Sequence, residues 1–503
     1  MNRNKVLLLV LSAASFYLTA CSGAPKQNGC PGGNCGGNGS VSMTLVADTL
    51  PANPSILSLQ VTITSITFTP ASGTATTVNL NPALTVDLMR LQTDTIFLGT
   101  FANIPAAQYS SATLTFTGNA NITFLNDTNA TLAGCPVNAV CPISVAASSN
   151  PVATISFTVS QNAVTGIGID LNLANAVSIS GANLAVNFAN NNVLGAFTLP
   201  RVGSNLAAGQ LDLIEDFTGV VSVGSNNVTV TSPTRGTLTA TSSSSSFFDV
   251  SPSGTICPTP STVSCVVNGQ IASVDAFLNS DGTLSLKEYE PLVATQQDLV
   301  EGTVISVASL TQFAMVVTDK SQAATNSLVA GLNAGDLLTV NISNTPPSTV
   351  KPFFVDTKGL AVPAASSGLF QGQTDTTAIH RGQTVSVHVT SFTAASGTTI
   401  ALVIADTATL RWSRFVAAAT GATSNTQINV NTLPSYFGFT AASVFPVQVF
   451  SGTLGADGVT NLDGITTAAS VTTAQPVGLR VLFLDNPGNT AQFPFMAAKI
   501  RQH

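Results

Sequence analysis

Residues 57–68 read Leu57-Ser58-Leu59-Gln60-Val61-Thr62-Ile63-Thr64-Ser65-Ile66-Thr67-Phe68. Apolar and polar side chains alternate strictly as far as Ile63, which is the pattern of a strand with one buried face. The alternation then slips by one residue, because the next apolar side chains are Ile66 and Phe68. A regular strand would turn these two to the opposite face. We therefore expect a β-bulge near Thr64 and Ser65 that returns them to the core.

The same alternation recurs along most of the chain. Short alternating runs lie at 114–116, 155–159, 167–173 and 184–188, with Gly, Pro, Asn and Ser between them. Many short strands separated by such turns predict an all-β protein built of sandwiches or barrels. Helical patterns are confined to short segments such as residues 326–332.

Charged residues are scarce in this sequence. Asp, Glu, Lys and Arg make up 8% of the 503 residues, against about a quarter in an average protein. Ser, Thr, Asn and Gln must therefore fill the solvent-facing positions. The net charge of -7 argues against a nucleic-acid partner, which needs clustered Lys and Arg to neutralise its phosphates.

Residues 1–20 have the layout of a signal peptide. Arg3 and Lys5 precede an apolar run that ends at Leu18, and the run is shorter than the roughly 20 residues of a membrane-spanning helix. It continues as Leu18-Thr19-Ala20-Cys21, which resembles the lipobox of bacterial lipoproteins. The resemblance implies cleavage before Cys21 and acylation at that residue, which would anchor the chain stably in a membrane. An ordinary secretory signal with a chance Cys is the alternative.

The residues after the lipobox predict a location and a tether. Ser22 resembles the residue found after the Cys in lipoproteins sent to the outer membrane, so we expect the cell envelope, at the periplasmic or the surface face. Residues 21–40 are rich in Gly and poor in apolar side chains. Such a segment cannot bury enough surface to order itself, and it predicts a flexible tether.

The other six cysteines fall into three close pairs. The pairs are Cys30 with Cys35, Cys135 with Cys141, and Cys257 with Cys265. Close pairing predicts local disulfides formed in an oxidising compartment. Zinc binding is the alternative, but the spacings exceed the usual two-residue gap and the chain has 3 His. We expect no metal and no cofactor.

Residues 41–200 carry a resemblance to a known family. The segments Leu45-Val46-Ala47-Asp48, Val86-Asp87-Leu88-Met89-Arg90-Leu91 and Ile104-Pro105-Ala106-Ala107-Gln108-Tyr109 resemble the domain-of-unknown-function 4382 family, found in bacterial lipoproteins. The resemblance implies a prealbumin-like or immunoglobulin-like β-sandwich and no assigned activity. Independently, Pro105 predicts a turn, and Tyr109 can pack its ring while its hydroxyl reaches the backbone, as in a tyrosine corner.

After Arg201 the sequence repeats itself. Residues 217–223 and 300–307 look like two copies of one opening strand, and 269–274, 382–387 and 478–483 look like three copies of a closing strand before a Gly-containing turn. These segments resemble the small barrel units of the domain-of-unknown-function 5666 family, which also has no assigned activity. We predict three β units, at 201–299, 300–417 and 418–503.

Motifs that would indicate catalysis or calcium binding are weak. Asn279, Asp281 and Glu288 have the spacing of part of an EF-hand loop, but Phe277 stands at the first ligand position, which favours an ordinary turn. A second acidic loop, Asp457-Gly458 with Asn461 and Asp463-Gly464, is explained equally by turn chemistry. Ser348-Thr349-Val350-Lys351 lacks the second motif of a penicillin-binding protein. We therefore expect no enzymatic activity.

Trp412, the one Trp of the chain, is flanked by Arg411 and Arg414 and is the candidate for recognition of a sugar or peptide. A partly buried Trp at a strand end is the alternative.

The preferred hypothesis is a non-enzymatic lipoprotein, held at the membrane by its lipid, that serves as a structural or adhesion module. A second hypothesis is a module that binds an extracellular polysaccharide or peptide through a groove at Trp412. A third is a hydrolase, which would need two carboxylates facing each other across a cleft with perturbed pKa values.

Overall fold

The predicted strand over residues 57–68 lies inside β2 (Ser55–Pro70) in the computed structural model. The structure describes residues 37–48, 54–148, 152–190, 192–201, 206–232, 235–248, 263–293, 298–322, 326–342, 353–397, 399–439, 443–452, 458–484 and 493–503. Within these ranges the chain is almost entirely β-structure, as predicted. None of the helices described there has the length and apolar character needed to cross a membrane.

The β-bulge in β2 is confirmed. Its pairing with both neighbouring strands shifts register between Ile63 and Ser65. The slip keeps Ile66 and Phe68 on the inner face, where both side chains have no exposed surface, like Ile63 before the bulge. A single inserted residue thus corrects the phase of the hydrophobic pattern.

The first domain is a β-sandwich, called the sandwich domain below. A four-stranded sheet, in the order β11-β8-β1-β4, packs on a seven-stranded sheet, in the order β3-β2-β5-β6-β10-β9 with β7 beside β5. Its first sheet contains β1 (Asn38–Ala47), β4 (Ile96–Pro105), β8 (Val164–Leu171) and β11 (Leu194–Thr198). With β2, its second sheet contains β3 (Thr76–Asp87), β5 (Ala107–Leu125), β6 (Val140–Ser148), β7 (Val152–Val159), β9 (Val177–Ser180) and β10 (Asn183–Asn187). The short helices η1 (Arg90–Gln92) and α1 (Leu173–Ala176) connect strands.

Tyr109 fulfils the role predicted for it. Its hydroxyl donates a hydrogen bond of 2.8 Å to the carbonyl oxygen of Pro105, four residues upstream. Its ring is stacked on Phe157 at 5.2 Å between centroids and lies edge-on to Phe68 at 6.2 Å. The turn into β5 is therefore fixed to the sandwich core by one aromatic side chain.

Three further units, barrels 1 to 3, have the same topology. Each unit forms a six-stranded sheet, and five of its strands close into a barrel. The closure is a parallel pairing between the first and the fifth strand of the sheet order: β14 with β17, β20 with β23, and β26 with β29. Three antiparallel strands followed by a closing hairpin in this order give the connectivity of the OB-fold Greek-key barrel. The internal repeat of the sequence therefore corresponds to a repeated barrel.

The strands of the barrels are as follows. Barrel 1 contains β12 (Gln210–Val223), β13 (Asn227–Ser232), β14 (Gly236–Thr241), β15 (Phe247–Phe248), η2 (Val263–Cys265), β16 (Ile271–Asn279) and β17 (Leu284–Val293). Barrel 2 contains β18 (Leu299–Ser309), β19 (Gln312–Ser321), β20 (Leu337–Ile342), β21 (Phe353–Val355), α2 (Ala364–Ser367), η3 (Thr376–Ala378), β22 (Thr384–Thr393) and β23 (Ala401–Arg411). Barrel 3 contains β24 (Ser413–Ser424), β25 (Gln427–Asn431), η4 (Ser435–Phe437), β26 (Phe445–Val449), β27 (Asn461–Asp463), η5 (Ala468–Ser470), β28 (Pro476–Phe483) and β29 (Phe495–Gln502).

Two sequence predictions need correction. Barrel 3 begins at Ser413, so the boundary predicted after Ala417 falls inside β24. Residues 326–332 form turns and no helix. Val329 and Leu332 of this segment are buried in the core of barrel 2. Three of its backbone carbonyl groups, which a helix would use for its own hydrogen bonds, accept hydrogen bonds from the ammonium group of Lys320.

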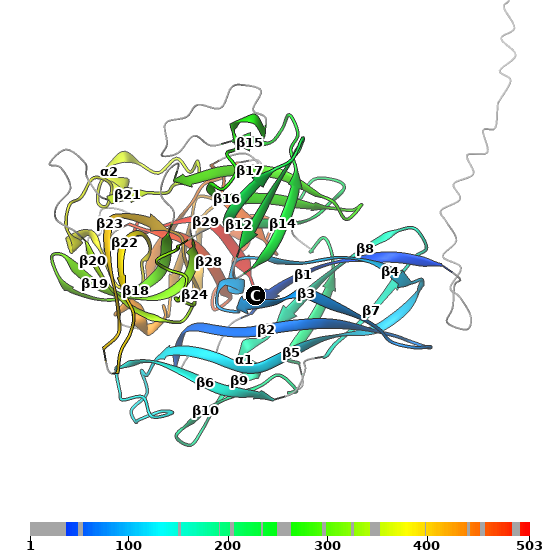
Figure 1. The fold of residues 1–503 in the computed structure, drawn as a ribbon, viewed down its shortest axis with the longest axis horizontal. Helices are drawn as coiled ribbons and strands as arrows, with labels where there is room; N and C mark the ends of the chain where they lie inside the picture. Colours follow the sequence, from blue (N-terminus) through cyan, green and yellow to red (C-terminus); the bar gives the residue numbers. More distant parts are fainter. Residues whose placement is uncertain are drawn as a thin grey trace, which may run out of the picture.

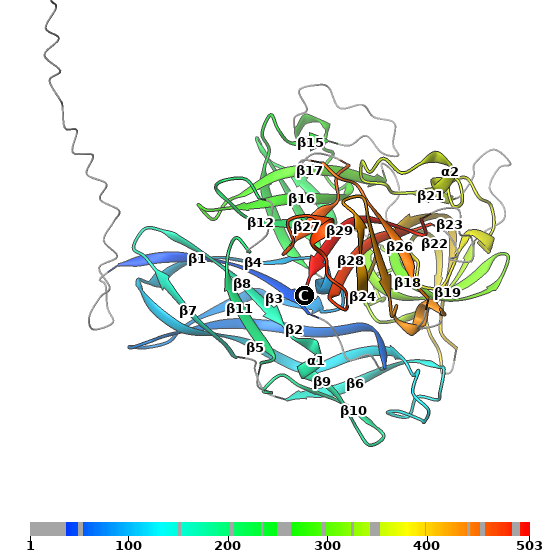
Figure 2. The same cartoon turned by 180° about the vertical axis from the view of Figure 1, so that it is seen from behind.

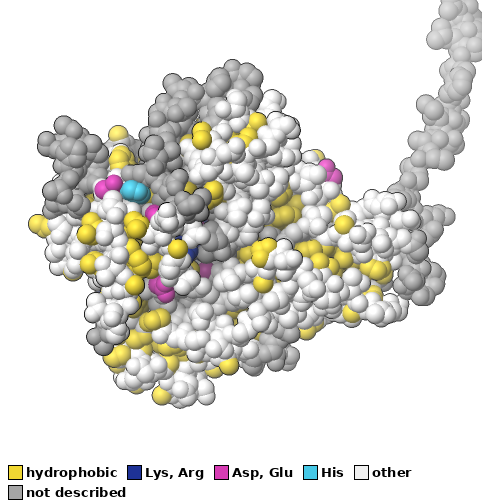
Figure 3. All heavy atoms as spheres, in the orientation of Figure 1, with side chains coloured by type: hydrophobic (Ala, Val, Ile, Leu, Met, Phe, Trp, Pro, Cys, Tyr) yellow, Lys and Arg dark blue, Asp and Glu magenta, His cyan; other side chains and the backbone are white. Residues whose placement is uncertain are grey.

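The domains lie against one another rather than in a row. Figures 1 and 2 show the three barrels gathered on one side of the sandwich domain, with the C-terminus at the point where they meet it. On the face drawn in Figure 3, few charged atoms are visible among the described residues. The scarce charges are concentrated elsewhere.

Candidate functional site

Charged side chains from all four domains meet in the interior where the domains join. Eight basic and nine acidic side chains are linked there by ion pairs with N···O distances of 4.0 Å or less. This junction cluster consists of Arg90, Asp94, Glu215, Asp216, Asp275, Lys287, Glu288, Glu301, Asp319, Asp356, Lys358, Arg411, Arg414, Asp463, Arg480, Lys499 and Arg501. The chain has 16 Lys and Arg residues, so half of its basic side chains lie in this one cluster.

A backbone irregularity places the central carboxylate. The pairing of β12 with β16 shifts register between Ile214 and Phe217, so that Glu215 and Asp216 are not paired with β16 in the regular way. Asp216 has a φ of 54°, a left-handed conformation that Asp tolerates better than most residues. Alternation along the strand is broken here, and both carboxylates are buried.

Asp216 of barrel 1 is in contact with cations from each of the other domains. Its carboxylate lies 3.1 Å from Arg411 and 3.5 Å from Lys358, both of barrel 2. It also contacts Arg414 of barrel 3 and lies 3.7 Å from Arg90 of the sandwich domain. Burial alone would raise the pKa of Asp216, but Lys358, Arg411 and Arg414 outweigh burial and hold the pKa well below its usual range.

The sandwich domain enters the cluster through the loop that contains η1. Arg90 reaches Asp319 at 2.7 Å and Glu301 at 3.5 Å, both in barrel 2. Asp94 accepts a hydrogen bond of 2.8 Å from Nε of Arg414 in barrel 3. Burial would raise the pKa of Asp94, but Arg414 and Arg90 lower it to about 2, so this carboxylate stays ionised.

Basic side chains of barrels 1 and 3 also hold the backbone of the same loop. Arg501 donates hydrogen bonds to the carbonyl oxygens of Leu91 and Asp94 at 2.9 and 3.0 Å. Arg235 donates to the carbonyl oxygen of Thr95 at 3.1 Å and lies over the ring of Phe217. The loop that follows Val86 and Asp87 is therefore the part of the sandwich domain to which the barrels dock.

Barrel 3 is tied to barrel 1 by a second group of pairs. Glu215 accepts from Lys499 at 2.5 Å and lies 3.2 Å from Arg480. Within barrel 3, Asp463 lies 2.6 Å from Nε of Arg501. The carboxylate of Asp463 is therefore paired with Arg501 and is not free to bind calcium. Asp457, from the same acidic loop of the sequence, lies outside the described residues.

The predicted recognition site at Trp412 is wrong. The Trp412 side chain has no exposed surface and belongs to the core of barrel 2, with Arg480 over its ring at 5.8 Å. Arg411 and Arg414, which flank it, are 2% and 7% exposed and point into the junction cluster. Trp412 lies where barrel 2 passes into barrel 3, so the domains enclose its ring, and its two flanking arginines pair with carboxylates of the chain.

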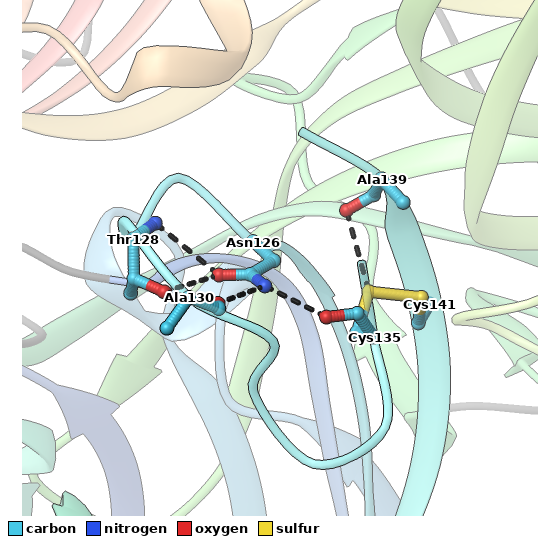
Figure 4. The surroundings of a disulfide bond; sticks show 6 residues. All are labelled: Asn126, Thr128, Ala130, Cys135, Ala139 and Cys141. Carbon is cyan, nitrogen blue, oxygen red and sulfur yellow. Dashed lines mark hydrogen bonds between the residues drawn. A yellow bond between two sulfur atoms is a disulfide. The ribbon is translucent and has the colours of Figure 1, made fainter. Parts of the chain in front are cut away.

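The cysteine prediction is confirmed where it can be followed. Cys135 and Cys141 form a disulfide, with 5.8 Å between their Cα atoms. Figure 4 shows Asn126 beside it, donating from its amide nitrogen to the carbonyl oxygens of Ala130 at 2.9 Å and Cys135 at 2.8 Å. The bridge thus closes a loop at the end of β5. Cys21, Cys30, Cys35 and Cys257 lie outside the described residues, as does the side chain of Cys265.

The segment that resembles part of an EF-hand is a turn, as favoured by the sequence. Asp281 accepts hydrogen bonds from the backbone amide of Thr283 at 2.9 Å and from its hydroxyl at 2.6 Å. Glu288 lies apart from this turn, buried in β17. Within the described ranges, no three or more His, Cys, Asp or Glu side chains are grouped as metal ligands.

One carboxylate pair bears on the hydrolase hypothesis. Asp48 and Asp170 share a hydrogen bond, and the pKa of Asp170 is raised to about 7 by burial and by the charge of Asp48. Asp48 also lies 2.8 Å from Nδ1 of His503, and Asp170 lies 3.8 Å from Arg201. The carboxyl groups of a glycosidase stand about 5 Å or more apart across the substrate. These two touch each other, so they do not have that geometry.

The sequence contains one indication of the junction cluster, which is the position of two acidic residues within an apolar strand. In Leu213-Ile214-Glu215-Asp216-Phe217, two acidic residues stand inside an apolar strand of a chain that is only 8% charged. Charged residues at such positions are buried only when they are paired. The partners are up to several hundred positions away, so the sequence did not show which residues they are.

Comparison with protein families adds one match. The model described as "Domain of unknown function (DUF4382)" matches residues 38–187. Neither curated proteins nor solved structures gave a significant match to this chain. The match includes Arg90 and Asp94, so the family's sequence pattern extends over the loop that docks onto the barrels. The resemblance of the three barrels to the 5666 family stays a prediction.

Proposed function

We propose that this chain, whose residues 38–187 form a DUF4382 domain, is a non-enzymatic lipoprotein of the cell envelope that serves as a rigid structural or adhesion module. Its lipid would be attached at Cys21 and its folded part held away from the membrane by the segment that follows. The alternative of a hydrolase finds less support, because the buried carboxylates of the junction cluster are paired with cations of the chain itself.

The observation that carries the proposal is the junction cluster. A buried ion pair gains little stability over a well-packed apolar contact, but an unpaired buried charge is costly. A rotation of one domain against the others would separate pairs such as Asp216 with Arg411 or Asp94 with Arg414. The cluster therefore favours the docked arrangement over those that leave a buried charge unpaired, which suits a protein that has to keep a fixed shape.

The surface of the molecule is consistent with such a role. Pairs of exposed hydroxyls run across its sheets, such as Thr67 with Thr77 at 2.9 Å in the sandwich domain and Thr229 with Thr239 at 2.9 Å in barrel 1. Among the described Lys and Arg residues, Arg381 alone is exposed, and the others are buried or half-buried. A surface of this kind offers hydrogen bonds without long-range steering by charge.

The proposal is tested in the bacterium that makes the protein. We expect mass spectrometry of the membrane fraction to find a chain that begins at an acylated Cys21, and we expect a Cys21→Ala variant to leave that fraction. Protease treatment of intact and of lysed cells then shows on which side of the outer membrane the domains lie. An uncut leader with an unmodified thiol in the wild-type chain would overturn the proposal.

A further inference from the structure

Barrel 1 has a pocket at the edge of the junction cluster, lined in part by two members of the cluster, Lys287 and Glu288. It has a volume of about 200 Å³ and lies over β15, β16 and β17. Its lining includes Gln210, Ser243, Phe247, Phe277, Lys287 and Glu288. Pockets for drug-sized ligands begin at about 300 Å³, so this one has room for a single small ring.

A β-bulge turns two consecutive side chains toward this pocket. Asp275 of β16 is paired with Glu288 and Ala276 with Leu286, so Lys287 is the extra residue of β17. In a regular strand, neighbours point to opposite faces. At this bulge Lys287 and Glu288 line the pocket together with Ser285 and Leu286. Bulges of this kind re-aim side chains at functional sites.

Glu288 leaves one acceptor unused. The residue is 3% exposed, and its Oε1 has no hydrogen-bond partner among the described residues. Lys287 does not take up this atom, since it lies 3.7 Å from Oε2 and 3.4 Å from Asp275. A buried polar atom without a partner is costly. A ligand hydroxyl that reached Oε1 from the pocket would satisfy it.

The rim of the pocket adds hydroxyls and a flat apolar surface. Ser243 and Ser245 line it, and their hydroxyls are hydrogen-bonded to each other at 2.8 Å. Ser246 fixes this segment to β17 through a 2.6 Å hydrogen bond to the carbonyl oxygen of Leu286. Phe247 is 43% exposed and is the one aromatic residue among the large apolar side chains exposed in the described ranges.

We propose that this pocket binds one neutral sugar ring, with the ring of Phe247 against its C–H face and Glu288 and the serine hydroxyls bonded to its hydroxyl groups. The inference goes beyond the structural role, which does not depend on it. Polar groups at the base and an aromatic ring at the rim match the two faces of a pyranose. The one cation of the pocket, Lys287, already lies 3.4 Å from the carboxylate of Asp275, so a charged sugar acid gains little from it.

The protonation state of Glu288 agrees with a neutral ligand. Burial raises the pKa of Glu288 to about 8, and the nearby charge of Asp275 contributes to the rise. Near neutral pH, the carboxyl group therefore holds its proton and both donates and accepts hydrogen bonds. A sugar hydroxyl does the same, so the two can form a reciprocal pair.

The test uses the full chain and the methyl glycosides of glucose, galactose, mannose and N-acetylglucosamine, with methyl glucuronide as the charged probe. Saturation-transfer NMR and calorimetry measure binding. We expect at least one neutral glycoside to bind with a Kd near 1 mM, a range typical of a single small contact site, and methyl glucuronide not to bind.

Variants then locate the site. We expect Phe247→Ala and Glu288→Ala each to weaken binding at least about tenfold, and Glu288→Gln, whose amide keeps a donor and an acceptor, to retain it. Leu310→Ala, which removes a 61% exposed apolar side chain from barrel 2, serves as the matched control and should bind like the wild type. Should Glu288→Ala fail to fold, Phe247→Ala still decides, because it changes an exposed residue.

Three results would overturn the proposal. These are no binding by any neutral glycoside, preferential binding of the glucuronide, and neutral binding that Phe247→Ala leaves intact. None of them affects the lipid anchor or the rigidity of the four domains, so failure of this inference is distinct from failure of the proposed function.

Discussion

Asp216 of barrel 1 lies 3.1 Å from Arg411 of barrel 2, although 195 positions separate them in the sequence. Both side chains are nearly inaccessible, at 1% and 2% exposure. Such a pair exists only when the two barrels are docked. The docked arrangement of the domains is therefore the one in which these buried charges have their partners, and an unpaired buried charge is costly.

The first prediction concerns Asp216 itself. Asp216→Asn keeps the shape of the side chain but leaves Arg411, Arg414 and Lys358 without their shared carboxylate. We expect the free energy of unfolding in urea to fall by about 3–5 kcal/mol, the cost of breaking a buried pair. Asp281→Asn in the exposed turn is the control, since Asn can still accept the hydrogen bonds from Thr283, and it should change stability by less than about 0.5 kcal/mol. Equal effects of the two substitutions would refute the role of Asp216.

The second prediction concerns the pH dependence of stability. The pKa of Glu288 is raised from 4.5 to about 8 by burial, so the folded protein holds this proton more tightly than the unfolded chain does. Stability from Glu288 is then complete below about pH 4.5 and is lost as the pH rises toward 8. Glu288→Gln cannot ionise, so the variant should gain stability relative to the wild type between pH 5 and pH 8, measured by urea unfolding at both values. A difference between the two proteins that is the same at both pH values would contradict the assignment.

The third prediction uses Trp412 as a reporter. The chain has a single Trp, and its ring is fully buried between barrel 2 and Arg480. We expect native fluorescence emission at short wavelength that acrylamide hardly quenches, with a shift to long wavelength only on unfolding. Trp412→Ala should cost about 3–5 kcal/mol of stability. Strong quenching in the native state would show that the ring is accessible after all.

The fourth prediction concerns the disulfide between Cys135 and Cys141. With a sequence separation of 6, it restricts the unfolded chain only slightly, so replacing both cysteines by Ser should cost no more than about 2 kcal/mol. We expect limited proteolysis to cut residues 126–139 faster in this variant while the rest of the domain stays intact. Global unfolding of the variant at room temperature would contradict a purely local role.

The fold followed from the sequence to the extent that it depends on local pattern. Alternation over residues 57–63 and its slip before Ile66 predicted a strand with a bulge, and both are present because each depends only on which residues face the core. The same holds for Tyr109, whose partner Pro105 is four residues away. The repeated hairpins predicted small barrels for the same reason.

The junction cluster did not follow, because its pairs join distant parts of the chain. Nothing near Trp412 distinguishes an aromatic ring that recognises a ligand from one that is enclosed between domains. Its flanking residues Arg411 and Arg414 read equally well as a binding surface and as ion-pair partners. Their carboxylates, Asp216 and Glu301, come from strands in two other parts of the sequence.

The central claim is that the cluster holds the four domains as one rigid body, and a distance measurement tests it most directly. Spin labels carried by unnatural amino acids at the exposed sites Thr158 in the sandwich domain and Leu310 in barrel 2 leave the native cysteines untouched. We predict one narrow distance distribution by pulsed electron paramagnetic resonance for the wild type. It should broaden for Arg90→Gln, which removes the contacts of the sandwich domain with Asp319 and Glu301. A broad distribution in the wild type, or one that Arg90→Gln leaves narrow, would contradict the claim.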